Sequence, residues 1–106
     1  MPTMEQIEEL SASLGREFSP DLIVLFGSYA RGEATKDSDV DLLVIVSFEG
    51  KAVHQSVKMR MTVRPSFPID LIVRTPEQVR ERLAMADDFI QDILDEGKIL
   101  YEADQC

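Results

Sequence analysis

The amino-acid sequence predicts an α/β (α+β) fold in which one mixed sheet of three to five strands is flanked by helices. Short apolar runs alternate with longer segments of helical spacing, in the order helix, strand, helix, strand, helix, strand, helix, helix and a last short strand. The chain has 106 residues, 44% of them hydrophobic, and no linker-like stretch divides it. One domain over residues 1–106 with one modest core is therefore expected.

Residues 4–14 have the pattern of an amphipathic helix. Thr3 and Gln6 have the spacing of a capping box, and Gly15 is expected to end the helix as its C′ residue. Three apolar side chains fall on one face of this helix: Ile7, Leu10 and Leu14.

The central stretch, residues 22–46, predicts two strands joined by a polar segment. The run 22–26 is apolar throughout, which indicates a strand covered on both faces. Residues 27–31 are expected to begin a short helix directly after this strand, and a polar loop follows over 32–38. The run 40–46 predicts the second strand, which is again almost continuously apolar.

The next segment predicts a helix over residues 51–63 and a strand over 69–73. Two prolines, at positions 65 and 68, limit the extent of the helix because proline breaks a helix interior. The helix has apolar residues at four-residue spacing, namely Val53, Val57 and Met61.

The last third of the chain predicts two helices and an edge strand. The segment 75–78, Thr-Pro-Glu-Gln, has an N-cap residue, a proline at N1 and a glutamine at N3, which is a helix start. Asp87 or Asp88 is expected to cap the following helix, which Gly97 ends. Residues 99–101 are expected to form the edge strand.

Composition excludes several kinds of partner. The net charge of −9 argues against a protein that coats nucleic acid and against an anionic membrane surface as partner. Cys106 is the only cysteine, no charged-then-apolar leader is seen, and no apolar run approaches the roughly 20 residues that span a bilayer. A cytoplasmic protein is therefore expected.

The charge is unevenly distributed. Residues 50–69 contain no acid but four cations, Lys51, Lys58, Arg60 and Arg64. This basic segment fits a phosphate, an acidic partner or a solvated helix face, and the sequence does not separate the three.

Asp39 and Asp41 stand two positions apart at the head of the second strand. Period-two geometry places both side chains on one face, with Cα atoms about 6.6–6.8 Å apart. Two unit charges at that separation repel by about 2–3 kcal/mol at an effective dielectric constant near 20. A divalent cation between them reverses the sign, because magnesium prefers oxygen ligands. The alternative is a pair of solvated loop aspartates, and these two residues alone leave both interpretations open.

Gly27 and Ser28 directly follow the first strand. Glycine permits an unusual turn and close backbone approach, and a serine at a helix start adds a hydroxyl to exposed backbone N–H groups, which suits an anion. Arg31 either adds charge to such a phosphate site or pairs with Glu33 at the surface. If the two central strands pair, this turn and the two aspartates meet at one end of the sheet.

Other motifs fit these residues less well. Residues 37–41 resemble the first half of an EF-hand loop, but Leu42 stands where that loop needs glycine and Phe48 where it needs glutamate. In aspartate-based phosphatases the apolar strand precedes the Asp-x-Asp pair, whereas here it follows. The chain has no nucleophile elbow and no Gly-x4-Gly-Lys-Ser/Thr loop, and His54 is expected to be structural or exposed.

Gly27-Ser28, ten residues and then Asp39-Val40-Asp41 resemble the signature of the DNA polymerase beta-type nucleotidyltransferase superfamily. The longer stretch GSYARGEATKDSDVDLLV resembles the minimal nucleotidyltransferase branch, and the resemblance covers essentially the whole chain. It implies the nucleotidyltransferase fold and a third carboxylate on a neighbouring strand. Asp70 matches that carboxylate in type and position, and its alternative is a solvated aspartate at a strand end.

The resemblance implies transfer of an NMP from an NTP, ATP by resemblance alone, to a hydroxyl, with two magnesium ions. Asp39 and Asp41 would hold both ions, and Asp70 would bind the catalytic ion and help to deprotonate the hydroxyl. The residues implied to bind the β- and γ-phosphates are Gly27 and Ser28, with Arg31 as a further candidate.

The resemblance also implies a partner. Larger relatives carry an acceptor-binding domain, which this chain is expected to lack. Stand-alone minimal members often act as antitoxins that add AMP to a tyrosine of a HEPN-domain ribonuclease toxin. A HEPN-type toxin is therefore the expected partner, without direct nucleic-acid binding. Two alternatives remain: a non-catalytic antitoxin that neutralises its partner by complex formation, and a transferase that acts on a small molecule such as an aminoglycoside.

Overall fold

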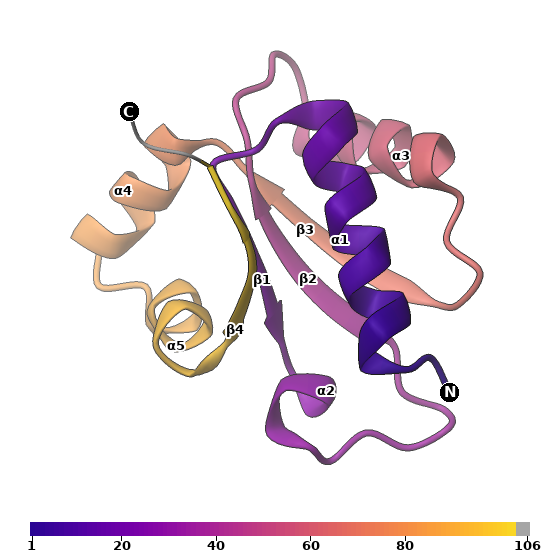
Figure 1. Ribbon diagram of the computed structural model, residues 1–106. Coiled ribbons are helices and arrows are strands. Elements are labelled where there is room, and N and C mark those ends of the chain that lie inside the picture. The colour runs from indigo at the N-terminus through magenta and orange to yellow at the C-terminus, as the bar shows by residue number, and fades with distance from the viewer. Residues whose placement is uncertain (104–106) are drawn as a thin grey trace.

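In the computed structural model, which describes residues 1–103, four strands form one mixed sheet in the order β3-β2-β1-β4 (Figure 1). β1 pairs antiparallel with β2 and with β4, whereas β2 and β3 run parallel. The predicted mixed α/β architecture is confirmed, and the predicted edge strand is β4. Cys106 lies outside the described residues. The strands are β1 (Leu22–Phe26), β2 (Val40–Ile45), β3 (Ile69–Arg74) and β4 (Lys98–Glu102).

Helices cover both faces of the sheet (Figure 1). α1 (Met4–Phe18) and α3 (Ala52–Val63) lie on one face, and α4 (Pro76–Ala84) and α5 (Asp88–Glu96) lie on the other. α2 (Ser28–Arg31) follows β1 directly at one end of the sheet. The strands divide their side chains between two cores: Ile23, Leu25, Val40, Leu42 and Val44 pack toward α1 and α3, and Val24, Leu43 and Ile45 toward α4 and α5. The predicted covering of the first strand on both faces is confirmed.

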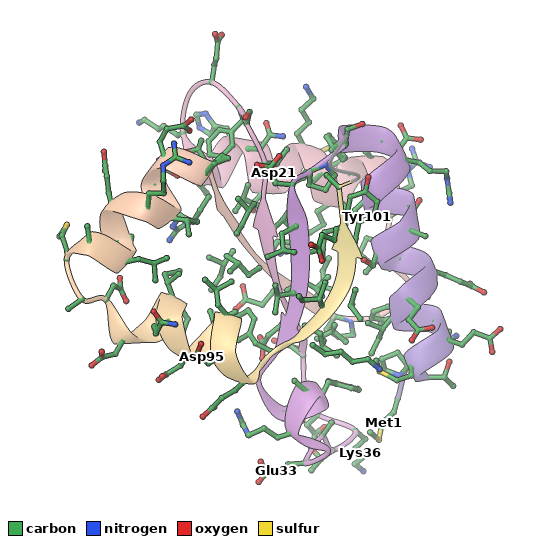
Figure 2. The ribbon with its side chains drawn as sticks, turned by 60° about the vertical axis from the view of Figure 1, so that its left-hand side comes forward. Met1, Asp21, Glu33, Lys36, Asp95 and Tyr101 are labelled. Carbon is green, nitrogen blue, oxygen red and sulfur yellow. The ribbon has the colours of Figure 1, made fainter. Side chains whose placement is uncertain are left out.

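α1 begins as predicted and ends later than predicted. The capping box is present, with the Thr3 N–H donating to Gln6 Oε1 at 2.8 Å and the Gln6 N–H donating to Thr3 Oγ1 at 3.1 Å. The expectation that Gly15 ends the helix is wrong, because α1 continues to Phe18 and Ser19 is its C-cap with φ 46°. Gly15 is instead a buried helix residue, at which an added Cβ would collide with the Tyr101 ring. Figure 2 shows Tyr101 between β4 and α1, so this glycine allows the last strand to approach the first helix.

α3 occupies the predicted range, but the apolar spacing that predicts it faces solvent. Val53, Val57 and Met61 are 62%, 50% and 70% exposed. The helix contributes Met59 to the core instead, and that side chain is fully buried.

The last two helices begin where the sequence predicts. The Thr75 side chain accepts from the Gln78 N–H at 3.1 Å, and the reciprocal bond completes the capping box of α4. Asp87, one of the two predicted candidates, caps α5 by accepting from the Phe89 N–H at 3.0 Å. Within residues 1–103, no helix is both long enough and apolar enough to cross a membrane.

Candidate active site

Asp41 and Asp70 are direct neighbours in the sheet. They are registered partners across the parallel β2–β3 pair, and neighbouring strands lie about 4.8 Å apart. Residues on either side of Asp41 pack toward α1 and α3, so its own side chain points to the opposite face, the one that α4 and α5 cover. Asp39 lies one residue before β2. The structure thus brings Asp70, the predicted third carboxylate, beside Asp41.

The other two carboxylates influence Asp41 electrostatically. Asp41 is half-buried, whereas Asp39 and Asp70 are exposed. The pKa of the Asp41 carboxyl is raised above its ordinary value, first by burial and then by the negative charges of Asp70 and Asp39. The positive charge of Arg31 acts in the opposite direction. The alternative of a solvated loop aspartate fits the exposure of Asp39 but not the half-buried Asp41.

Gly27 connects the turn after β1 to the carboxylates. Its backbone angles, φ 74° and ψ −153°, belong to a region that residues with a side chain avoid. A Cβ built on Gly27 would collide with Oδ2 of Asp41, so that carboxylate rests against the glycine backbone. The antiparallel pairing of Phe26 with Asp41 produces this contact. Ser28 follows as the first residue of α2, where backbone N–H groups have no intrahelical acceptor.

Arg31 adopts the surface alternative. Its Nε donates to Glu33 Oε1 at 2.6 Å, and the side chains are 57% and 65% exposed. The charge of Arg31 nevertheless reaches Asp41, whose pKa it lowers against the other influences. His54, the single histidine, was expected to be structural or exposed, and it is exposed on α3.

A cleft of about 330 Å³ opens beside Gly27, between α2 and α5. Phe26 and Phe89 meet edge to face in its wall, with ring centroids 6.0 Å apart, and Phe89 is 54% exposed. No residue of α5 was predicted to belong to the site, because apolar residues on an amphipathic helix indicate packing. The exposure of Phe89 depends on how α5 packs in the folded chain, and the sequence pattern does not predict that packing. The cleft is lined by Phe26, Gly27, Ala30, Arg31, Phe89, Asp92, Ile93, Glu96 and Gly97.

The carboxylates fit a hard cation in chemical type. Their donor atoms are all oxygen, which suits magnesium. A cation would relieve the repulsion by Asp70 and Asp39 that, after burial, raises the pKa of Asp41. Across the part of the chain that the structure describes, no three or more His, Cys, Asp or Glu side chains are gathered closely enough to hold a metal ion. Asp39, Asp41 and Asp70 would therefore have to turn their side chains toward a common point to bind one ion together.

Comparison with known proteins identifies the family of this arrangement. The model of the nucleotidyltransferase domain family matches residues 7–101, a range that includes the turn after β1 and all three aspartates. The chain belongs to the nucleotidyltransferase domain family. This nucleotidyltransferase is 32% identical over 79 residues to a Methanocaldococcus jannaschii protein named "Putative protein adenylyltransferase MJ0604", with 74% of this chain and 76% of the relative covered.

Two further comparisons agree with this assignment. The protein adenylyltransferase MntA of Thermococcus cleftensis is 48% identical to this nucleotidyltransferase over 48 residues, which cover 42% of this chain and 48% of the relative. A crystal structure described as a toxin–antitoxin with AMP-PNP superimposes with a TM-score of 0.58 at 23% identity, covering 92% of this chain and 75% of the other. That likeness shows the shared fold.

Proposed function

We propose that residues 1–106 form a minimal nucleotidyltransferase that uses magnesium to move AMP from ATP to a protein hydroxyl. The acceptor is a tyrosine of a HEPN-type ribonuclease toxin, and this chain is the antitoxin in the cytoplasm. The observation that carries the proposal is the meeting of the Gly27-Ser28 turn, Asp41 and Asp70 at one end of the sheet. Relatives named as protein adenylyltransferases support a protein acceptor, and the structural neighbour described as a toxin–antitoxin supports a toxin.

In the proposed reaction the acceptor oxygen attacks the α-phosphorus of ATP. The bond between that phosphorus and the α–β bridging oxygen breaks, pyrophosphate leaves, and Asp70 helps to take the proton of the hydroxyl. Asp39 and Asp41 would hold two magnesium ions, and Asp70 would be a further ligand of the catalytic one. Bound magnesium supplies the positive charge that offsets the triphosphate and the leaving pyrophosphate.

The turn after β1 holds the β- and γ-phosphates in this proposal. Gly27 has no side chain to obstruct them, and Ser28 offers its hydroxyl and a free backbone N–H. Arg31 is a further phosphate ligand if it leaves Glu33.

The cleft beside Gly27 supports an aromatic acceptor. Phe26 and Phe89 provide aromatic walls against which a tyrosine ring can pack edge to face. Asp92 and Glu96 line the same cleft and favour positively charged residues next to that tyrosine.

The test is label transfer to a toxin expressed together with this chain. Magnesium and α-labelled ATP should give a labelled toxin whose intact mass rises by whole AMP units, with pyrophosphate released. EDTA or Asp41→Asn should abolish the transfer. Asp21→Asn is the matched control, because Asp21 is an exposed carboxylate at the other end of β1 (Figure 2). A toxin of unchanged mass, without pyrophosphate release, would refute the proposal.

A second candidate is an antitoxin that acts by binding alone. The observation that favours it is the lack, within residues 1–103, of a preassembled cluster of three metal-binding side chains. The variant carrying both Asp39→Asn and Asp41→Asn separates the two functions in cells. Continued neutralisation of the toxin by that variant would support the binding function, and lost neutralisation would support catalysis.

A further inference from the structure

α3 presents an apolar outer stripe to solvent, made of Val53, Val57 and Met61. These residues are one helical turn apart, so the stripe is continuous and about 12 Å long. A helix that covers a sheet normally turns its polar side outward, yet here the outward side chains are 50–70% exposed and apolar. Contiguous exposed apolar side chains bordered by polar ones mark interaction surfaces.

The border of this outer stripe is positively charged. Lys51, Lys58, Arg60 and Arg64 are all exposed, and residues 50–69 contain no acid although the chain carries a net charge of −9. Arg60 donates to the backbone oxygen of Ile69 at 3.2 Å. The ion pairs found within residues 1–103 involve Arg31, Arg80 and Arg82, so none of these four cations is paired with a carboxylate there.

The outer stripe lies on the opposite side of the sheet from the candidate active site. α3 packs with α1 on one face of the sheet, and α4 and α5 cover the other (Figure 1). Strand alternation directs the side chains of Asp41 and Asp70 to the face covered by α4 and α5. A partner bound to α3 therefore leaves the carboxylates and the neighbouring cleft open.

We propose that the outer stripe of α3 docks an amphipathic helix of a partner protein, with apolar residues on the stripe and Asp or Glu residues against its basic border. Charge complementarity selects this occupant. Two-fold pairing with a second copy would place the basic borders against each other. Nucleic acid favours aromatic stacking platforms, and the stripe is aliphatic. An anionic membrane would repel a chain of net charge −9.

The probe is a synthetic helical peptide with leucines at four-residue spacing and glutamates on both flanks, titrated at low salt into the whole ¹⁵N-labelled chain. We expect saturable shifts of α3 amides, and binding at least about tenfold tighter than for the same peptide with lysines in place of glutamates, a difference of about 1.4 kcal/mol. Val57→Asp should remove the binding. Met85→Asp is the matched control, because Met85 is 75% exposed away from α3, and it should leave the binding unchanged.

Several results would overturn the proposal. Equal affinity for both peptides, shifts confined to the cleft around Phe89, or equal effects of Val57→Asp and Met85→Asp would each exclude a charge-selective α3 site. A concentration-dependent dimer that Val57→Asp abolishes would show that a second copy occupies the stripe. Binding to phosphatidylglycerol vesicles that Val57→Asp abolishes would show that a membrane does.

The rate of AMP transfer should be the same for the Val57→Asp variant and the unchanged chain when the acceptor does not bind to α3. Failure of the transfer reaction therefore leaves the peptide result intact, and the reverse also holds.

Discussion

At the scale of single residues, the Asp41 carboxylate lowers the stability of the metal-free fold, although the proposed reaction requires it. Its carboxylate is half-buried, rests against Gly27 and lies beside Asp70. We expect Asp41→Asn to stabilise the chain in metal-free buffer by about 1 kcal/mol, the Coulomb repulsion left after solvent screening. For a domain of this size that corresponds to a melting temperature about 4–8 °C higher. Asp21→Asn removes the same charge from the other end of the strand and should change the melting temperature little.

The pH dependence of stability should report the same carboxylate. Because the pKa of Asp41 is higher in the folded than in the unfolded chain, its ionised form destabilises the fold at neutral pH. That penalty is lost as the pH falls through the folded pKa toward the unfolded value near 3.8. We therefore expect the stability advantage of Asp41→Asn to be largest at neutral pH and to shrink on acidification. Urea unfolding of both chains between pH 7 and pH 4 measures it, and a constant difference would contradict the assigned cause.

Gly27 should be the least replaceable glycine of the site. Gly27→Ala combines a backbone conformation that costs about 1–3 kcal/mol for other residues with a collision against the Asp41 carboxylate. Gly32→Ala is the control for a positive φ, since Gly32 has φ 73° with ψ 23°, in the left-handed region, and open space around its would-be Cβ. We expect Gly27→Ala to abolish AMP transfer and Gly32→Ala to retain it at a cost near 1 kcal/mol in unfolding free energy. Equal loss of transfer in both variants would make the backbone angle, rather than the contact with Asp41, the cause.

The aspartates could be selected from the sequence because their signal is local. Spacing and the apolar strand that follows single out Asp39 and Asp41, and Asp70 interrupts an apolar run. The choice between phosphate and Glu33 for Arg31, and the role of Phe89 in a cleft wall, depend on contacts between elements. A pattern along one chain segment contains no information about those contacts.

At the scale of helices and strands, Gly15 allows α1 to pack closely against β4, the last strand. In a helix interior, Gly→Ala ordinarily stabilises by about 0.5–1 kcal/mol. Here the added Cβ meets the Tyr101 ring, so we expect Gly15→Ala to destabilise the chain by about 1–3 kcal/mol through overpacking. In a Tyr101→Ala background the same change should become neutral or stabilising. Urea unfolding of the four chains tests this cycle, and a stabilising Gly15→Ala in the unchanged background would contradict it.

Helix beginnings and the buried face of α1 (Ile7, Leu10 and Leu14) were predictable, whereas the face that α3 buries was not. The capping boxes at Thr3 and Thr75 form within three residues, so the sequence contains all of their chemistry. The role of Gly15 in α1 depends on its contact with Tyr101 of β4, more than eighty positions away in the sequence. The direction of the apolar stripe of α3 depends on what the helix packs against, and four-residue spacing fits a buried face and a docking face equally well.

At the scale of the whole molecule, the sheet order produces the site. β2 and β3 lie side by side and parallel, so the predicted carboxylates begin neighbouring strands at the same end. β1 runs antiparallel to β2, so Gly27, which follows the last residue of β1, lies at the end of the sheet where β2 and β3 begin. The sequence predicted strands and motifs, whereas the order β3-β2-β1-β4 depends on pairings between distant segments, such as β1 with β4.

The molecular charge predicts that binding of a nucleoside triphosphate will depend on magnesium. A triphosphate approaching a chain of net charge −9, at an end that holds three carboxylates, is repelled unless a cation lies between them. We therefore expect ATP with magnesium to stabilise the fold by about 2.7 kcal/mol at one hundred times its Kd. ATP with EDTA should stabilise far less at the same concentration. Differential scanning fluorimetry measures both, with Asp41→Asn and Gly27→Ala as variants that should lose the response and Gly32→Ala as one that should keep it. Equal stabilisation by ATP with and without magnesium would show that the nucleotide binds away from the carboxylates.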